Sequence, residues 1–365
     1  MKKIIAILFM LGFCQCTDYL DIVPDNVATI DHAFRDKARA EQFLFTCYSY
    51  IPRNGLPQAP GRFDDFMWSH RGVDWLNQLQ YIILRERNDA NDPKLNYWSG
   101  TGGSTNLYIG IRDCNTFIER INEVVDLDLY EKKRWAAEVK FLKAYYHFYL
   151  LQMYGPIPII KENLPVSADE EKVSVFREPV DDVFNYVIQL IDEAIPDLPL
   201  NIQNKVSEEG RITQPIALAM KAKILVTAAS PLFNGNKDYK MLIDKRGVQL
   251  FNQTYDPGKW TKALLACKNA IDTCHMAGHQ LYWYQPLKLS EETRLIAQVS
   301  QIVTDKWNCE HIWGTGHYSN SNLNEEFTIP PLDSKHNTFC RSVSVPTMKA
   351  VESFYSKNGV PINED

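Results

Sequence analysis

The sequence predicts a mainly α-helical protein in which antiparallel helix pairs stack into a superhelix that carries long irregular loops. Two observations lead to this prediction. Apolar residues recur at spacings of three and four in several segments between residues 30 and 278, which is the pattern of helix faces. The stretches 53–106 and 279–365 lack this periodicity and are rich in aromatic and small polar residues. A length of 365 residues can bury a sizeable core, and 45% hydrophobic against 23% charged residues argues against a disordered chain.

The periodic segments are predicted helices, and Pro or Gly marks most of their ends. A first stripe of Phe43, Cys47 and Ile51 stops at Pro52, because proline cannot continue a helix. The segment 130–154 is apolar nearly all round, which is typical of an inner helix packed on several sides. The other predicted helices cover residues 107–125, 180–194, 213–229 and 257–278.

Two of these helices carry spacings typical of tetratricopeptide repeats. Ala137, Phe141 and Ala144 have the small–aromatic–small order found in the second helix of such a repeat. Trp260 and Ala263 match the first helix. The fold class predicted is therefore a degenerate tetratricopeptide-type helical-pair superhelix. Its helical scaffold lies mainly at 30–52 and 107–278, with loop-rich binding regions at 53–106 and 279–365.

The charge balance argues against a nucleic-acid partner. The formal net charge is −6, and no run of basic residues exceeds the triplet Lys132-Lys133-Arg134. A protein that binds a polyanion normally presents a basic stripe to it.

The N-terminus reads as an export signal. Lys2 and Lys3 precede an apolar run from Ile4 to Phe13, which is too short to span a bilayer as a helix. Cys14 and Cys16 follow at the junction where a bacterial lipoprotein is cleaved and lipidated, and either one could be the lipidated residue on this evidence alone. The remaining cysteines are predicted to be small buried hydrophobic residues: Cys47, Cys114, Cys267, Cys274, Cys309 and Cys340.

Segments along the whole chain resemble the SusD/RagB lipoproteins of the Bacteroidetes. They are Cys16–Asp21, Leu107–Asn115, Ala136–Pro158, Gly210–Gly235, Trp260–Ala263, Glu310–Ile312 and Phe354–Ile362. The resemblance implies that Cys16 is the lipidated residue, that residues 1–15 are the signal peptide and that residues 16–365 form a single domain. Family members usually continue well past the segment that ends here at Ile362, whereas this chain stops at Asp365, so a shortened or incomplete chain is expected.

The resemblance also implies a function. Proteins of this family are non-catalytic lipoproteins of the outer-membrane surface, which bind glycan and deliver it to a SusC-like TonB-dependent transporter. No cofactor, metal or catalytic residue is expected. The family's ligand-contacting positions vary, so no individual residue is transferred by the resemblance.

Candidate glycan-binding residues come from the chemistry of the loop regions. Aromatic faces bind the C–H side of sugar rings, and carboxylates and guanidiniums bind the hydroxyls. For each aromatic residue the alternative is packing against the scaffold. The candidates are Asp65, Trp68, Arg71, Trp75, Tyr81, Trp98, Trp283, Trp307, Trp313 and Tyr318.

Two other classes of function stay open. An exported tetratricopeptide-type scaffold would bind peptide or protein, and a secreted glycosidase would need two carboxylates that flank one bond. Adjacent acidic pairs such as Asp64-Asp65 do not show such an arrangement, because neighbouring side chains point apart. His275 and His279 have a zinc-compatible spacing, but Met276 stands where a metalloprotease has its glutamate.

Overall fold

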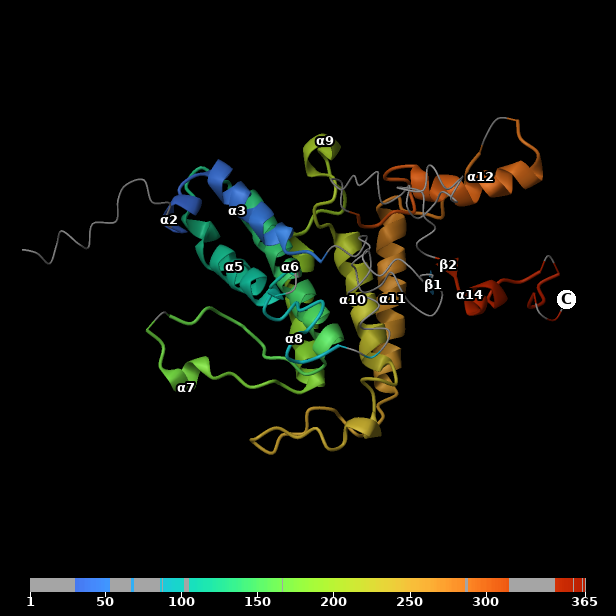
Figure 1. Ribbon diagram of the computed structural model, residues 1–365. Helices are drawn as coiled ribbons and strands as arrows, with labels where there is room; N and C mark the ends of the chain where they lie inside the picture. The colour runs from blue at the N-terminus through green and yellow to red at the C-terminus, as the bar shows by residue number, and fades with distance from the viewer. Residues whose placement is uncertain are drawn as a thin grey trace, which may run out of the picture.

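Figure 1 shows a computed structural model of the chain. The residues that it describes are 30–52, 67–68, 86, 88–101, 105–165, 167–285, 288–314, 345–356, 358–362 and 364, with the backbone alone at 67, 68 and 345.

The described residues are mostly helical, which confirms the predicted fold class. The longer helices are α3 (Lys37–Ser49), α5 (Leu107–Arg120), α6 (Leu129–Tyr154), α8 (Val180–Ala194), α10 (Gln214–Ala229), α11 (Gly258–Met276) and α12 (Glu291–Thr304). The shorter ones are α2 (Ile30–Ala33), α7 (Glu170–Val173), α9 (Lys205–Glu208), α14 (Met348–Glu352), and the 3₁₀ turns η3 (Ile121–Glu123), η4 (Ile195–Asp197) and η5 (Lys237–Tyr239). Strand β1 (Met67–Trp68) pairs antiparallel with β2 (Val345–Pro346), so the two predicted loop regions meet there.

Local capping explains where the central helices begin and end. The Asp128 carboxylate accepts a hydrogen bond from the Glu131 backbone N–H and thereby caps the first turn of α6. Gly155 ends α6 with a φ of 69°, a left-handed conformation that glycine adopts without strain. Asn106 caps α5 through bonds from the N–H groups of Tyr108 and Ile109.

Helix α6 is the centre of the packing. It contacts α5 and α8, and α10 in turn lies between α8 and α11, so these helices stand side by side (Figure 1). Its buried side chains point in several directions around the helix, as the all-round apolar pattern predicts. The largest of them are Trp135, Phe141, Tyr146 and Phe148.

One of the longer helices was not predicted. Helix α12 lies within 279–365, for which the sequence predicts loops, and it projects from the helical stack in Figure 1. None of its residues is buried, and Leu295, Val299 and Val303 are exposed. Its start does have a local signal, because the Ser290 hydroxyl accepts a bond from the Thr293 N–H ahead of two glutamates in the first turn.

The prediction for the cysteines is only partly right. Cys47, Cys114 and Cys274 are buried, whereas Cys267 and Cys309 are half-buried, and all five are free thiols. Cys267 lies at the edge of the contact between α10 and α11, where it packs against the cluster of Leu218, Ala222 and Ala270 but stays partly exposed. Cys14, Cys16 and Cys340 lie outside the described residues.

A buried histidine joins α6 to the chain that follows it. The Nδ1 atom of His147 lies 2.8 Å from the Lys143 carbonyl oxygen, and its Nε2 accepts a bond from the Ile160 N–H. Burial lowers the pKa of His147 to about 4. Burial also lowers the pKa of Lys143, whose Nζ donates to the Lys161 carbonyl oxygen, to about 8. The imidazole is therefore neutral in the folded protein at physiological pH.

We predict that His147 makes the fold sensitive to acid. A histidine whose pKa is lowered on folding adds stability that is complete above pH 6.5 and is lost as the pH falls toward 4. From the shift of His147, the loss amounts to about 3 kcal/mol. Urea unfolding at several pH values should show this loss in the wild type and a flatter profile in His147→Gln. The exposed residue His311 provides the control: His311→Gln should keep the wild-type profile, and a His147→Gln profile that also matches it would contradict the prediction.

Candidate functional site

A groove with a volume of about 450 Å³ lies between three segments that are distant in the sequence. One side is the turn before α10, around residues 200–216, the second is the C-terminal end of α11, and the third is the turn that follows α12. Its lining includes two tryptophans, Trp307 and Trp313. A smaller depression of about 240 Å³ beside α6 has three lysines and no aromatic side chain in its lining. The larger groove is therefore the better candidate for sugar binding.

Trp307 occupies a strained position in this groove. Its φ is 54°, in the left-handed region that a bulky side chain rarely adopts. Two glycines lie beside its indole: a Cβ atom on either Gly210 or Gly314 would stand 3.6 Å from Trp307 Cη2, at ordinary van der Waals distance. The backbone thus holds the half-buried indole at the wall of the groove.

Trp313 is shared between the groove and the scaffold. Its ring packs edge-on against Phe141 and Tyr145 of α6, with centroid distances of 5.6 and 5.4 Å. These contacts leave the side chain half-buried, with part of its surface in the groove lining.

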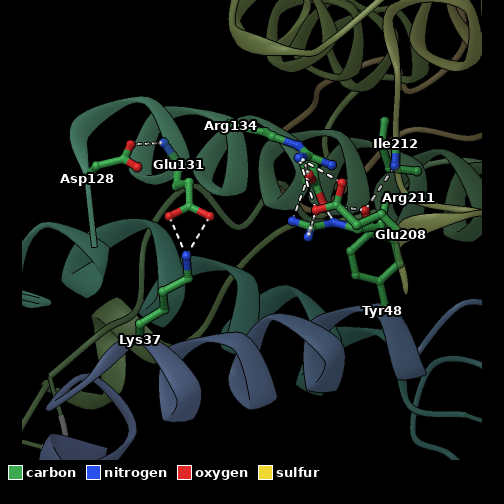
Figure 2. Close-up of polar contacts among 9 residues, drawn as sticks. Lys37, Tyr48, Asp128, Glu131, Arg134, Glu208, Arg211 and Ile212 are labelled. Atoms are coloured by element: carbon green, nitrogen blue, oxygen red, sulfur yellow. Dashed lines mark hydrogen bonds and ion pairs between the residues drawn. The ribbon is translucent and has the colours of Figure 1, made fainter. Parts of the chain in front are cut away.

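A buried ion-pair cluster fixes the wall formed by residues 208–213. The Arg211 guanidinium donates to Glu138 from Nε and Nη2, both at 3.0 Å, and to Glu208 from Nη1 at 2.9 Å. Arg134 donates to the same two carboxylates, at 3.1 Å in each case. Figure 2 shows this cluster between α6 and the wall. Two guanidiniums and two carboxylates therefore balance one another.

Tyr48 of α3 completes the cluster. Its hydroxyl donates to Glu138 Oε2 at 2.7 Å and accepts from the Ile212 N–H at 3.1 Å (Figure 2). Burial raises the pKa of the Glu138 carboxyl, while Arg211 beside it acts in the opposite direction. Lys37 adds a second link between α3 and α6 through Glu131, with Nζ at 2.6 Å from Oε2. The groove wall is thus bound to the helical scaffold at its back.

Hydrogen bonds also tie the segment after α11 to α12 and its turn. The Gln280 N–H donates to the Cys309 carbonyl oxygen at 3.1 Å, and the Tyr282 N–H donates to Glu310 Oε2 at 2.9 Å. The Gln298 side chain bonds the backbone of Tyr282 and Tyr284. This segment carries Trp283, whose side chain is 63% exposed but is not part of the groove lining.

The structure brings together only some of the predicted ligand residues. Trp307 and Trp313 line the groove, and Trp283 lies exposed in the neighbouring segment. Trp98 packs edge-on against Tyr108 and Tyr154, with Arg177 5.4 Å from its ring centre, and is not in the groove lining. The candidates outside the described residues, with the side chain of Trp68 among them, stay predictions: Asp65, Trp68, Arg71, Trp75, Tyr81 and Tyr318.

Several groove residues were not predicted as ligand residues. Thr213, His279 and His311 line the groove with polar groups, and Arg211 forms part of its wall. No spacing in the sequence marks these positions as sugar ligands, since they come together only through tertiary contacts. Among the described residues, no group of three or more His, Cys, Asp or Glu side chains is placed to hold a metal ion.

Comparison with known proteins identifies relatives of this chain. The profile of a SusD-like family, described as "Starch-binding associating with outer membrane", matches residues 18–226. A "SusD-like protein" of Bacteroides ovatus is 26% identical over 247 residues, which are 65% of this chain and 41% of that protein. The solved structure of BT4246 is 25% identical, with a TM-score of 0.74 over 90% of this chain and 58% of that one. A SusD-like protein from Bacteroides fragilis NCTC 9343 has the same fold, with a TM-score of 0.66, 20% identity, and coverage of 93% of this chain and 57% of that one.

The chain is shorter than these relatives. The chain spans about two fifths of the curated relative and somewhat more than half of each of the two solved structures.

We predict that Gly210→Ala disturbs the groove more than a matched glycine substitution. Gly210 has a φ of 91°, and a Cβ there would lie 3.0 Å from the Gly314 carbonyl oxygen. Gly247 has a φ of 80° with nothing within 4 Å, so Gly247→Ala carries the backbone strain alone. Urea unfolding should show a loss of about 1 kcal/mol for Gly247→Ala and a larger loss for Gly210→Ala.

The near-ultraviolet circular dichroism of the tryptophans supplies a second readout. It should change in Gly210→Ala, because the Gly314 carbonyl oxygen beside the Trp307 ring must give way, and it should stay unchanged in Gly247→Ala. Equal losses of stability and equal spectra in the two variants would show that Gly210 does not support the indole.

Proposed function

Because the chain belongs to the SusD-like family, we propose that it binds glycan at the cell surface without cleaving it and delivers it to a SusC-like TonB-dependent outer-membrane transporter. The family description as starch-binding and outer-membrane associated supports this proposal. The observation that carries it is the groove, in which two indoles meet a small set of polar side chains.

The groove has the chemistry that a sugar ring requires. An indole face covers the apolar C–H side of a pyranose, and Trp307 presents its ring at the wall. The Thr213 hydroxyl and the imidazoles of His279 and His311 can exchange hydrogen bonds with sugar hydroxyls. Binding of this kind orients a sugar without changing its bonds.

The carboxylates near the groove favour capture over hydrolysis. A glycosidase needs two carboxyl groups that flank the scissile bond. Glu209 is the one carboxylate among the described residues that line the groove. Glu138 and Glu208 lie behind the wall, where Arg134 and Arg211 hold them.

The proposal includes an N-terminal lipid anchor at Cys16, which lies outside the described residues. In the part of the chain that the structure describes, no helix is long and apolar enough to cross a bilayer. Several acyl chains on one cysteine would hold the protein at the outer membrane. A tethered binding protein raises the glycan concentration that a neighbouring transporter meets.

One observation favours a second candidate function, an exported tetratricopeptide-type scaffold that binds peptide or protein. The outer face of α11 carries an apolar stripe in which Trp260 is 44%, Leu264 69% and Ile271 55% exposed. An amphipathic helix could pack along such a stripe.

Affinity electrophoresis on a panel of neutral and acidic polysaccharides separates these functions. We predict that at least one polysaccharide retards the protein and that no sugar is released. Trp307→Ala should raise the dissociation constant for that polysaccharide at least about tenfold, because an aromatic anchor is lost. Trp260→Ala, which removes an exposed tryptophan of α11 outside the groove, should leave it unchanged.

Other outcomes would point elsewhere. Released sugar would indicate hydrolysis, and indifference to every polysaccharide would favour the scaffold. Equal effects of Trp307→Ala and Trp260→Ala would place the binding site outside the groove.

Lipidation can be tested separately. We predict that Cys16→Ala releases the protein from the membrane fraction, because the anchor is lost, whereas Cys14→Ala leaves it there. Fractionation with mass spectrometry of the mature N-terminus measures both. Membrane association of the Cys16→Ala variant without any lipid on its N-terminus would defeat the assignment.

A further inference from the structure

The charged side chains of the groove decide which sugars it can hold. Three described residues of the lining carry a permanent charge, namely Lys205, Glu209 and Arg211. A sugar with a carboxylate or sulfate group loses water when it enters a groove, and this costs free energy unless a cation replaces the water. The question is therefore whether any of these cations is free to do so.

Arg211 is paired with carboxylates of the protein. All three of its nitrogens donate to carboxylates, Nε and Nη2 to Glu138 and Nη1 to Glu208. The side chain is only 5% exposed. Removing it from Glu138 would leave a buried carboxylate with one partner fewer, which is costly. Arg211 is thus a structural cation and not a ligand for an anion.

Lys205 and Glu209 bring one positive and one negative charge to the lining. They stand four residues apart, at and just after the short helix α9, and both face the groove. Lys205 is exposed to water, where an ion pair gains little, and Glu209 repels an incoming anion. The pair therefore provides no net positive charge.

The amides of the groove are also in use. The Asn308 side chain donates to the carbonyl oxygens of Ile302 and Asp305 and accepts from the Glu310 N–H. The Asn201 amide, in the orientation that satisfies both of its ends, donates to the Ala277 carbonyl oxygen at 3.1 Å. The Thr213 hydroxyl and the two imidazoles are the remaining polar side chains of the lining.

We propose that this groove selects uncharged sugar residues and rejects uronic acids and sulfated sugars. The inference rests on the proposed glycan-binding function and names the substrate class of the same site. Hydroxyl groups match the neutral donors and acceptors of the lining, and the indoles cover the C–H faces. Among the described residues of the lining, an anionic group finds no net positive charge, because Arg211 is paired with Glu138 and Glu208 and the charge of Lys205 is matched by that of Glu209.

The experiment compares two ligands that differ only in charge. The purified chain is first screened by calorimetry against starch, laminarin, galactomannan and xyloglucan, and against polygalacturonate, alginate and chondroitin sulfate. The neutral glycan with the tightest binding is then oxidised at C6, which converts primary hydroxyls into carboxylates on the same backbone. All titrations are run in the same buffer at pH 8.

The oxidised glycan should bind at least about tenfold more weakly than its neutral parent. The ratio of the two dissociation constants, oxidised over neutral glycan, should fall in Glu209→Gln. This substitution removes the repelling carboxylate and leaves Lys205 unopposed. Lys205→Gln is the matched control and should widen the ratio.

Three results would overturn the inference, and they differ in what else they affect. Equal or tighter binding of the oxidised glycan, or binding of acidic polysaccharides alone, would refute neutral selectivity while glycan binding stands. A ratio that neither substitution moves would show that the charges of the groove do not set it. Binding of no polysaccharide at all would defeat the proposed function itself.

Discussion

Glu138 is a carboxylate with no exposed surface, and the packing of three separate segments depends on satisfying it. A buried charge of this kind is stable only when it is paired and hydrogen-bonded. Its partners come from α3 through Tyr48, from α6 through Arg134, and from the wall segment through Arg211. The helical stack and the groove wall are therefore not independent, because the same carboxylate fixes the position of both.

This ion-pair cluster determines the shape and the charge of the groove. Gly210 directly precedes Arg211, so the pairing of Arg211 with Glu138 also places the glycine beside the Trp307 indole. The positive φ of Trp307 costs about 1–3 kcal/mol in general, and the contacts of the surrounding turn must offset this cost. Because the Arg211 guanidinium is paired with the carboxylates of the cluster, the groove is aromatic and close to neutral. The pairing of Arg211 with Glu138 thus both fixes the groove wall and accounts for the proposed preference for uncharged sugars.

Sequence periodicity predicted the helices whose faces are buried, with α6 and α8 the clearest cases. It missed α12, since a helix without a buried face gives a weak periodic signal and only its cap marks it. The groove could not be predicted, because Glu138 and Arg211 are 73 residues apart and no spacing rule joins them. Trp98 and Trp307 looked alike as loop tryptophans, but Trp98 packs between two tyrosines whereas Trp307 lines the groove. Only tertiary contacts separate the two.

The most direct test of this account is a crystal structure of the chain with an oligosaccharide from the neutral glycan that it binds most tightly. The account predicts a pyranose ring stacked on the Trp307 indole, hydroxyl contacts to Thr213 or the neighbouring imidazoles, and an Arg211 that still pairs with Glu138. A sugar bound elsewhere, with the groove empty, would contradict the account. So would a contact between Arg211 and the ligand in which Arg211 no longer pairs with Glu138.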